Sequence, residues 1–205
     1  MTDELKNEKP APDVIIETLS RIAVIRLNRP AERNSFSAST LEELDQAVST
    51  LGQRADINAL IFTGTKGVFA SGANIRELSE LAPATARELA LRGQRLMQSI
   101  SDSPKLTIAA VNGFCMGGGL DLALACDLRC ASKGAVFAHP GARLGIITGW
   151  GGTQRLPRLI GPARALEILL TARRVTSAEA LEIGLVSWVG DAVLDHACEM
   201  AEQLV

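Results

Sequence analysis

Residues 112–127, NGFCMGGGLDLALACD, constrain the fold more than any other stretch of this chain. Three consecutive glycines precede a run that is apolar except for Asp121. Glycines before a buried helix either let backbone N–H groups meet a ligand or allow close packing of the helix on a strand. Asp121 could instead satisfy the N–H groups of the first helical turn. A phosphate-binding loop is disfavoured, because both common glycine patterns are absent and an acid would repel an anion.

Apolar segments on both sides of this motif predict an α/β fold. Strands are expected at residues 14–19, 22–27, 59–64, 106–113, 128–132, 135–140 and 185–189. Helices are expected at residues 40–51, 85–100, 161–171, 176–183 and 192–205, two of them starting with capping boxes at Thr40 and Thr176. Residues 141–161 form a glycine-rich segment. We expect a polar N-terminal tail at 1–12 and one core domain at 13–205.

The composition limits the classes of function. The net charge is −2 and the basic residues form no stripe, so we expect no nucleic-acid partner. The apolar runs are too short to span a membrane and the polar start contains no secretory signal, so we expect a cytoplasmic protein without a membrane partner. Four cysteines without CxxC pairing are expected as free thiols, and two histidines without ligand spacing predict no metal site.

A second stretch of small residues, FASGANI at 69–75, also follows an apolar segment. A ligand could lie along such a backbone, because Ala70, Ser71, Gly72 and Ala73 have little or no side chain. An oxyanion hole usually needs two convergent N–H donors. The two loops together therefore favour an oxyanion hole over simple packing.

These motifs resemble the crotonase (enoyl-CoA hydratase/isomerase) superfamily. The resemblance rests on FASGANIREL, AAVNGFCMGGGLDLALACDLRCAS, LGIITGWGGTQRLPRLIG and ALEIGLV, which occur in the family's order and belong to a region of about residues 13–205. It implies a crotonase-type spiral of strand-strand-helix (ββα) units and a homotrimer or dimer of trimers. It also implies a C-terminal helical trimerisation region, which we expect to be missing or truncated here, because the last helical pattern stops without a C-cap.

The resemblance also implies roles for individual residues. The N–H groups of Ala73 and Gly118 would form an oxyanion hole around the thioester carbonyl of an acyl-CoA. Coenzyme A would enter as part of the substrate, with no cofactor tightly bound. The positions expected to bind CoA or substrate are Arg33, Ser71, Ala73, Asn74, Ile75, Gly117, Gly118, Pro140, Gly141 and Arg143.

This chain departs from the family at both catalytic positions. Family hydratases use two glutamates, and Asp121 occupies the first position with a reach shorter by about 1.5 Å. At the position of the second glutamate this chain has Gly141, and it has Asn74 where the family usually has Asp. His139 is either a replacement acid or base or a structural histidine at a strand end. Arg143 could bind a substrate carboxylate or form a surface or inter-subunit salt bridge.

We therefore predict an acyl-CoA enzyme of the enoyl-CoA hydratase/isomerase type, a lyase that stabilises a thioester enolate. Its nominal reaction is hydration of a 2-enoyl-CoA, or the reverse dehydration, with Asp121 as the single carboxylate. Two alternatives stay open. A decarboxylase of a malonyl-type CoA thioester would need no second base, and a catalytically weak homologue would only bind acyl-CoA.

Overall fold

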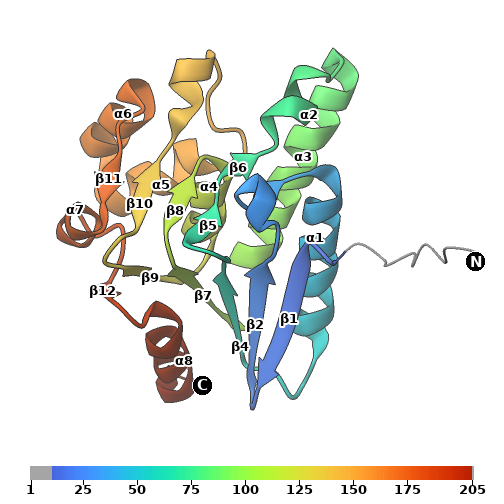
Figure 1. The fold of residues 1–205 in the computed structure, drawn as a ribbon, viewed down its shortest axis with the longest axis vertical. Helices are drawn as coiled ribbons and strands as arrows, with labels where there is room; N and C mark the ends of the chain where they lie inside the picture. The colour runs from blue at the N-terminus through green and yellow to red at the C-terminus, as the bar shows by residue number, and fades with distance from the viewer. Residues whose placement is uncertain (1–10, 205) are drawn as a thin grey trace, which may run out of the picture.

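The computed structural model describes residues 11–204, so most of the predicted tail lies outside the described residues. The largest sheet has six strands in the order β1-β2-β4-β7-β9-β12 (Figure 1). They are β1 (Val14–Leu19), β2 (Ile22–Leu27), β4 (Ala59–Thr63), β7 (Leu106–Val111), β9 (Leu128–Ser132) and β12 (Trp188–Gly190). β1 pairs antiparallel with β2, and all other pairs in this sheet are parallel.

Two smaller sheets carry the segments that lead to the glycine motifs. A four-stranded sheet has the order β11-β10-β8-β5, and a two-stranded sheet pairs β3 with β6. Their strands are β3 (Ser35–Phe36), β5 (Val68–Ala70), β6 (Gly72–Ala73), β8 (Phe114–Met116), β10 (Val136–Ala138) and β11 (Val175–Thr176). Both predicted glycine-rich turns therefore follow short strands of these sheets.

The helices alternate with strands along the chain. They are α1 (Ala38–Gln53), α2 (Ile75–Ser79), α3 (Pro83–Ser101), α4 (Gly118–Ala125), α5 (Gly152–Ile160), α6 (Pro162–Thr171), α7 (Ser177–Glu182) and α8 (Val193–Leu204). Two 3₁₀ helices span Pro30–Glu32 and Pro140–Leu144. The orders β5-β6-α2 and β7-β8-α4, and β1-β2 followed by the short β3 and α1, confirm the predicted α/β architecture of strand-strand-helix units.

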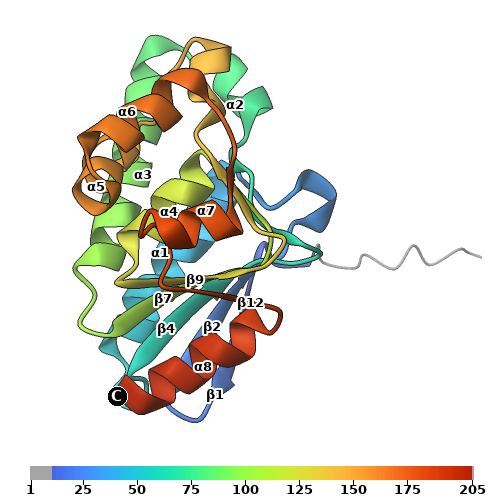
Figure 2. The same ribbon diagram turned by 90° about the vertical axis from the view of Figure 1, so that its left-hand side faces the viewer.

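The six-stranded sheet is covered on both faces, which explains the continuous apolar sequence of β4. Side chains alternate between faces along a strand, so Leu60 and Phe62 join the larger core while Ala59 and Ile61 join the smaller one. Helix α8 covers the smaller core, on the side of the sheet opposite α4 (Figure 2). The glycine motif thus lies on the side of the larger core.

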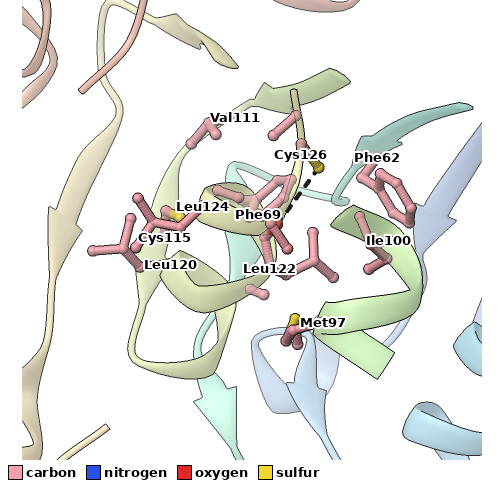
Figure 3. Close-up of a cluster of buried hydrophobic side chains, with 14 of the residues drawn as sticks. Phe62, Phe69, Met97, Ile100, Val111, Cys115, Leu120, Leu122, Leu124 and Cys126 are labelled. Atoms are coloured by element: carbon pink, nitrogen blue, oxygen red, sulfur yellow. Dashed lines mark hydrogen bonds between the residues drawn. The ribbon is translucent and has the colours of Figure 1, made fainter. Parts of the chain in front are cut away.

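Helix α4 lies at the centre of the larger core (Figure 3). All of its residues after Gly118 are buried, so its sequence shows no polar face. Leu120, Leu122 and Leu124 pack among aromatic and aliphatic side chains from β4, β5 and α3. The Cys126 thiol donates to the Leu122 carbonyl at 3.5 Å. A helix packed on every side holds Asp121 in a fixed position.

The first of the two predicted capping boxes is wrong. Helix α1 starts earlier, with Ser37 as N-cap accepting from the Thr40 N–H at 3.1 Å. The Thr40 hydroxyl instead donates to Asp13 at 2.7 Å, because Thr40 is already inside the helix and buried. The second box is correct at its N-cap, where Thr176 accepts from the Glu179 N–H at 3.2 Å. Gly184 follows the end of α7 with φ at 76°, a conformation that favours glycine and ends the helix.

Candidate active site

A pocket of about 580 Å³ opens between the FASGANI segment (residues 69–75, here called the second glycine loop), α2, α3 and residues 139–150. Its walls are mostly apolar, and Asp121 is the only carboxylate among the described residues that line it. The lining residues are Ser71, Gly72, Ala73, Ile75, Leu78, Ser79, Leu81, Ala86, Leu89, Ala90, Gly117, Gly118, Asp121, His139, Pro140, Gly141, Leu144, Ile146, Ile147, Thr148, Gly149 and Trp150.

The two glycine loops meet at one wall of this pocket. A Cβ atom added to Gly72 would lie 3.0 Å from the Gly118 nitrogen, so the two backbones touch. Gly118 is the first residue of α4, and its N–H group has no acceptor within the helix. The Asn74 N–H donates to Phe36 of β3 at 2.9 Å, and N–H groups alternate along an extended strand, so the Ala73 N–H is directed away from β3. Two backbone donors therefore border the same pocket.

Each glycine of the opening triplet has its own structural reason. Gly117 has φ at 52°, a conformation that favours glycine. A Cβ on Gly118 would overlap the Trp150 ring, lying 2.7 Å from Cε3. A Cβ on Gly119 would lie 2.5 Å from the Ala70 carbonyl oxygen. All three glycines thus meet a requirement of backbone conformation or close packing, and the Gly118 N–H borders the pocket as well, so the two interpretations do not exclude each other.

Asp121 is 2% exposed and does not cap its own helix. Its Oδ2 accepts a hydrogen bond from the Thr148 hydroxyl. Burial raises the pKa of the Asp121 carboxyl from 3.8 to about 6, and the rise is limited by the Thr148 hydrogen bond, by the charge of Arg155 and by the nearby backbone N–H groups of Gly152 and Trp150. The carboxyl is therefore mostly ionised at pH 7 and can accept a proton.

His139 lies directly after β10 and is 2% exposed. Its Nε2 is 3.6 Å from Asp121 Oδ1, and neither atom has a hydrogen-bond partner within residues 11–204. Burial lowers the pKa of the His139 imidazole from 6.5 to about 4, so the ring is neutral at pH 7. The pair at this pH is a carboxylate beside a neutral imidazole.

Trp150 both packs in the core and lines the pocket. Its ring lies between Gly93 of α3 and Gly118 of α4, and an added Cβ at either glycine would overlap it. The Phe36 ring lies 5.9 Å away at an interplanar angle of 39°. Trp150 thereby ties residues 139–152 to the start of α4.

The structure brings most of the predicted site residues to this pocket, but not all of them. Asn74 is the N-cap of α2, where its side-chain oxygen accepts from Arg76 and Glu77. Arg143 is exposed and lies outside the pocket lining. Arg33 is also exposed, although its carbonyl accepts from the Ser71 N–H at 3.1 Å and so ties its loop to the pocket. No Lys or Arg occurs among the described lining residues, so phosphate groups of a bound CoA would lie beyond the pocket.

Sequence reasoning missed three residues that shape the site. Thr148 and Asp121 are 27 positions apart in the sequence, and no residue near Thr148 in the sequence indicates their contact. Gly152 lies behind the pair, where an added Cβ would overlap Asp121 Oδ1 and lie 2.9 Å from His139 Nε2. Asn34 is buried and donates to the carbonyls of Val68 and Phe69 before the second glycine loop. The left-handed φ of 52° at Asn34 is visible only in the structure, so no sequence signal marked this role.

Within residues 11–204, no helix has the length and apolar character needed to cross a membrane. The same residues contain no group of three or more His, Cys, Asp or Glu side chains that could hold a metal ion.

Comparison with known proteins identifies the family. Residues 17–205 match the family described as "Enoyl-CoA hydratase/isomerase". The chain is 37% identical over 196 residues to the short-chain-enoyl-CoA hydratase of Clostridium acetobutylicum, covering 94% of this chain and 75% of that protein. It is 42% identical over 178 residues to the crotonyl-CoA hydratase of Syntrophomonas wolfei, covering 86% and 68%. The crystal structure of an enoyl-CoA hydratase from Bacillus anthracis superposes with a TM-score of 0.90 at 36% identity, covering 93% of this chain and 76% of that one.

The fold, the pocket and these relatives agree with one another. The predicted crotonase fold is confirmed by the structural superposition. The chain therefore belongs to the enoyl-CoA hydratase/isomerase family and is an enzyme of the enoyl-CoA hydratase type, a lyase.

Proposed function

We propose that the pocket binds the acyl end of a CoA thioester and stabilises its enolate through the N–H groups of Ala73 and Gly118. The reaction is hydration of a 2-enoyl-CoA, or the reverse dehydration, with Asp121 as the carboxylate that handles the proton. Coenzyme A enters as part of the substrate, and no tightly bound cofactor is needed. The named activities of the relatives support this assignment.

One observation carries the proposal. The backbone of Gly72 touches the nitrogen of Gly118, so the two N–H donors come to one wall of an apolar pocket that also contains Asp121. Donors of this kind stabilise a developing oxyanion most strongly where water is excluded. A carboxyl group with a pKa of about 6 is mostly ionised at neutral pH yet basic enough to take a proton from water.

The remaining substrate contacts follow from the same geometry. Residues 71–75 offer backbone groups to the pantetheine and adenine of CoA, with Ser71 and Ile75 lining the pocket. We assign Arg33 to the nucleotide phosphates, because the hydrogen bond from the Ser71 N–H to the Arg33 carbonyl holds the Arg33 loop beside the pocket. We also propose a homotrimer or a dimer of trimers. Exposed leucines on α5 and α6, Leu159, Leu166 and Leu170, are consistent with an interface there.

The test is an acyl-CoA panel assayed by mass spectrometry. With crotonyl-CoA we expect a mass gain of one water, and Asp121→Asn should lower kcat/KM by about 10²–10⁴-fold because its side chain cannot accept the proton. Asp102→Asn removes an exposed carboxylate outside the pocket and should leave the rate unchanged. Hydration by Asp121→Asn at the normal rate would overturn the role of Asp121. Loss of CO₂ from a malonyl-type thioester, with no hydration of any enoyl-CoA, would show a decarboxylase instead.

A further inference from the structure

Residues 139–152 deliver a different side chain to each oxygen of Asp121. The Thr148 hydroxyl donates to Oδ2, and His139 Nε2 lies 3.6 Å from Oδ1. Oδ1 and Nε2 are buried and have no hydrogen-bond partner among residues 11–204. Buried polar atoms without partners are rare in native structures, and such atoms call for an explanation. Here two of them face each other beside the pocket.

The backbone around these groups leaves little freedom. Gly152 lies directly behind the pair, where any side chain would overlap Oδ1. The segment that carries Thr148 is closed by a hydrogen bond from the Ile146 N–H to the Gly141 carbonyl at 3.0 Å. A Cβ at position 141 would lie 2.7 Å from the Ile146 carbonyl oxygen. The conformation that brings Thr148 to Asp121 therefore excludes a side chain at position 141.

The glycine at position 141 and the contact of Thr148 with Asp121 are therefore structurally linked. The missing carboxylate at position 141 and the presence of Thr148 on Asp121 both depend on how residues 141–148 fold. Restoring a glutamate at 141 would push against the backbone that positions Thr148. Position 141 carries no acid, and the segment that follows it supplies the hydroxyl that donates to the acid at position 121.

We infer that Thr148 is a positioning residue that fixes Oδ2 of Asp121, so that Oδ1 exchanges the proton of the reaction and shares it with His139 Nε2. This inference rests on the proposed hydration chemistry. One carboxylate and one neutral imidazole then do the work for which the family uses two carboxylates. Thr148 acts through Asp121 and does not itself need to touch the substrate.

The proton balance closes without a further reactant. An O–H bond of water breaks and its proton goes to Oδ1, while the oxygen forms a bond to C3 of the enoyl group. The C2=C3 electron pair moves through the conjugated system, and charge collects on the thioester oxygen near the N–H groups of Ala73 and Gly118. The same proton, held between Oδ1 and Nε2, then passes to C2 and restores the thioester carbonyl. Nothing is oxidised or reduced.

The groups facing Asp121 decide the direction of its titration. Arg155 from α5 favours the ionised carboxylate, and so does the hydroxyl of Thr148. Burial opposes them, and Cys115 of β8 is a buried thiol whose own pKa is raised, so it stays uncharged. Removing the Thr148 hydroxyl takes away a hydrogen bond to the charged form and must raise the pKa of Asp121.

The decisive comparison is Thr148→Val against Thr148→Ser, with the pH dependence of kcat/KM for crotonyl-CoA as readout. The wild-type rate should fall as pH drops through about 6. In Thr148→Val this acid limb should move upward by about one pH unit, with kcat/KM lowered about 10- to 100-fold. Thr148→Ser keeps the hydroxyl and should restore both. A carboxyl-carbon NMR titration of Asp121 gives the same pKa shift without relying on turnover.

The role of His139 is tested by His139→Gln, which keeps an N–H group near Oδ1 but has no basic nitrogen. We expect kcat to fall about tenfold with KM nearly unchanged, since proton sharing is lost while substrate binding remains. Gly141→Glu should have lower activity than the wild type, because the added side chain displaces residues 141–148. A rise in activity in Gly141→Glu would contradict the inference.

The outcomes separate this inference from the proposed function. If the wild-type enzyme hydrates crotonyl-CoA but Thr148→Val leaves the acid limb and the NMR pKa of Asp121 in place, the inference is wrong and the hydratase assignment stands. If no enoyl-CoA is hydrated by the wild type, the proposed function fails and the catalytic role inferred for Thr148 and His139 fails with it.

Discussion

The two sides of the pocket are built in different ways. On one side, β6 and the start of α4 present backbone N–H groups, and glycines allow the two segments to touch. On the other side, residues 139–152 present the side chains of His139, Thr148 and Trp150. In the proposed function, the first side binds the thioester group of the acyl-CoA substrate. The second side surrounds the carboxylate that would move the proton.

In the proposed function, the first side stabilises the enolate and the second side moves the proton. Backbone donors depend on chain conformation and tolerate little variation in sequence, which is why the glycine motifs match the family. The second side depends on its side chains and on the path of residues 141–148, and both can differ between proteins that share a fold. Variants on each side test whether the two sides contribute independently to stability and rate.

Trp150 is the point where the two sides meet, so its loss should have the largest effect on stability. Trp150→Ala removes a buried ring that packs between Gly93 and Gly118. We expect the free energy of unfolding to fall by about 3–5 kcal/mol, as for other buried aromatic truncations. Urea denaturation followed by circular dichroism measures the change. Trp188→Ala, a half-buried indole far from the pocket lining, is the matched control and should cost less.

Gly118→Ala should break the backbone side. The N–H group is retained, but the new methyl overlaps the Trp150 ring and displaces the donor. A displacement of about 1 Å near the reacting atoms can cost about 100-fold in rate, so we expect a loss of that size in kcat/KM. In a Trp150→Leu background the methyl has more room, and the additional loss should be smaller. Equal losses in both backgrounds would mean that the overlap is not the cause.

The pH dependence of stability tests the protonation states of Asp121 and His139 on the side-chain side. His139 has a lower pKa in the folded protein, about 4 against 6.5, so its contribution to stability rises with pH across that window. Asp121 has a higher folded pKa, about 6 against 3.8, so its contribution falls as pH rises. The two nearly offset each other in the wild type. Each alone is expected to change the free energy of unfolding by roughly 1–3 kcal/mol across its window.

Single variants should therefore reveal slopes of opposite sign. Asp121→Asn leaves the His139 contribution, and its stability should rise between pH 4 and 6.5. His139→Gln leaves the Asp121 contribution, and its stability should fall between pH 3.8 and 6. Denaturation midpoints measured across this range give both slopes, with His196→Gln as the control histidine. Parallel slopes in the two variants would show that the pair does not titrate as described.

The smallest effect is expected from Arg143, a predicted substrate contact that lies outside the pocket lining. Arg143→Ala should change kcat/KM for crotonyl-CoA less than about twofold, since exposed substitutions away from the site have small effects. Steady-state kinetics on the variant measure this. A large rise in KM would show that this side of the pocket also contributes a charged contact to binding.

The sequence indicated the two segments that meet at the backbone side of the pocket, but it did not indicate the side-chain contacts on the other side. The glycine triplet and the FASGANI segment have local signals, because tight turns and close approaches need glycine wherever they occur. Helix α5 was not predicted, since it starts at two glycines and contains Pro157, all of which usually mark loops. The contact of Thr148 with Asp121 depends on the tertiary path of residues 139–152. No local pattern could have indicated it.

The complete burial of α4 has a consequence for hydrogen exchange. Amide protons in a helix enclosed by the core exchange only when the whole domain opens, whereas those of an exposed segment such as residues 142–147 exchange through local openings. The backbone that carries Asp121 should therefore be among the last parts of the molecule to take up deuterium. The segment that brings Thr148 to it should be among the first. We therefore expect the acid to be held by one of the slowest-exchanging segments and oriented by one of the fastest-exchanging.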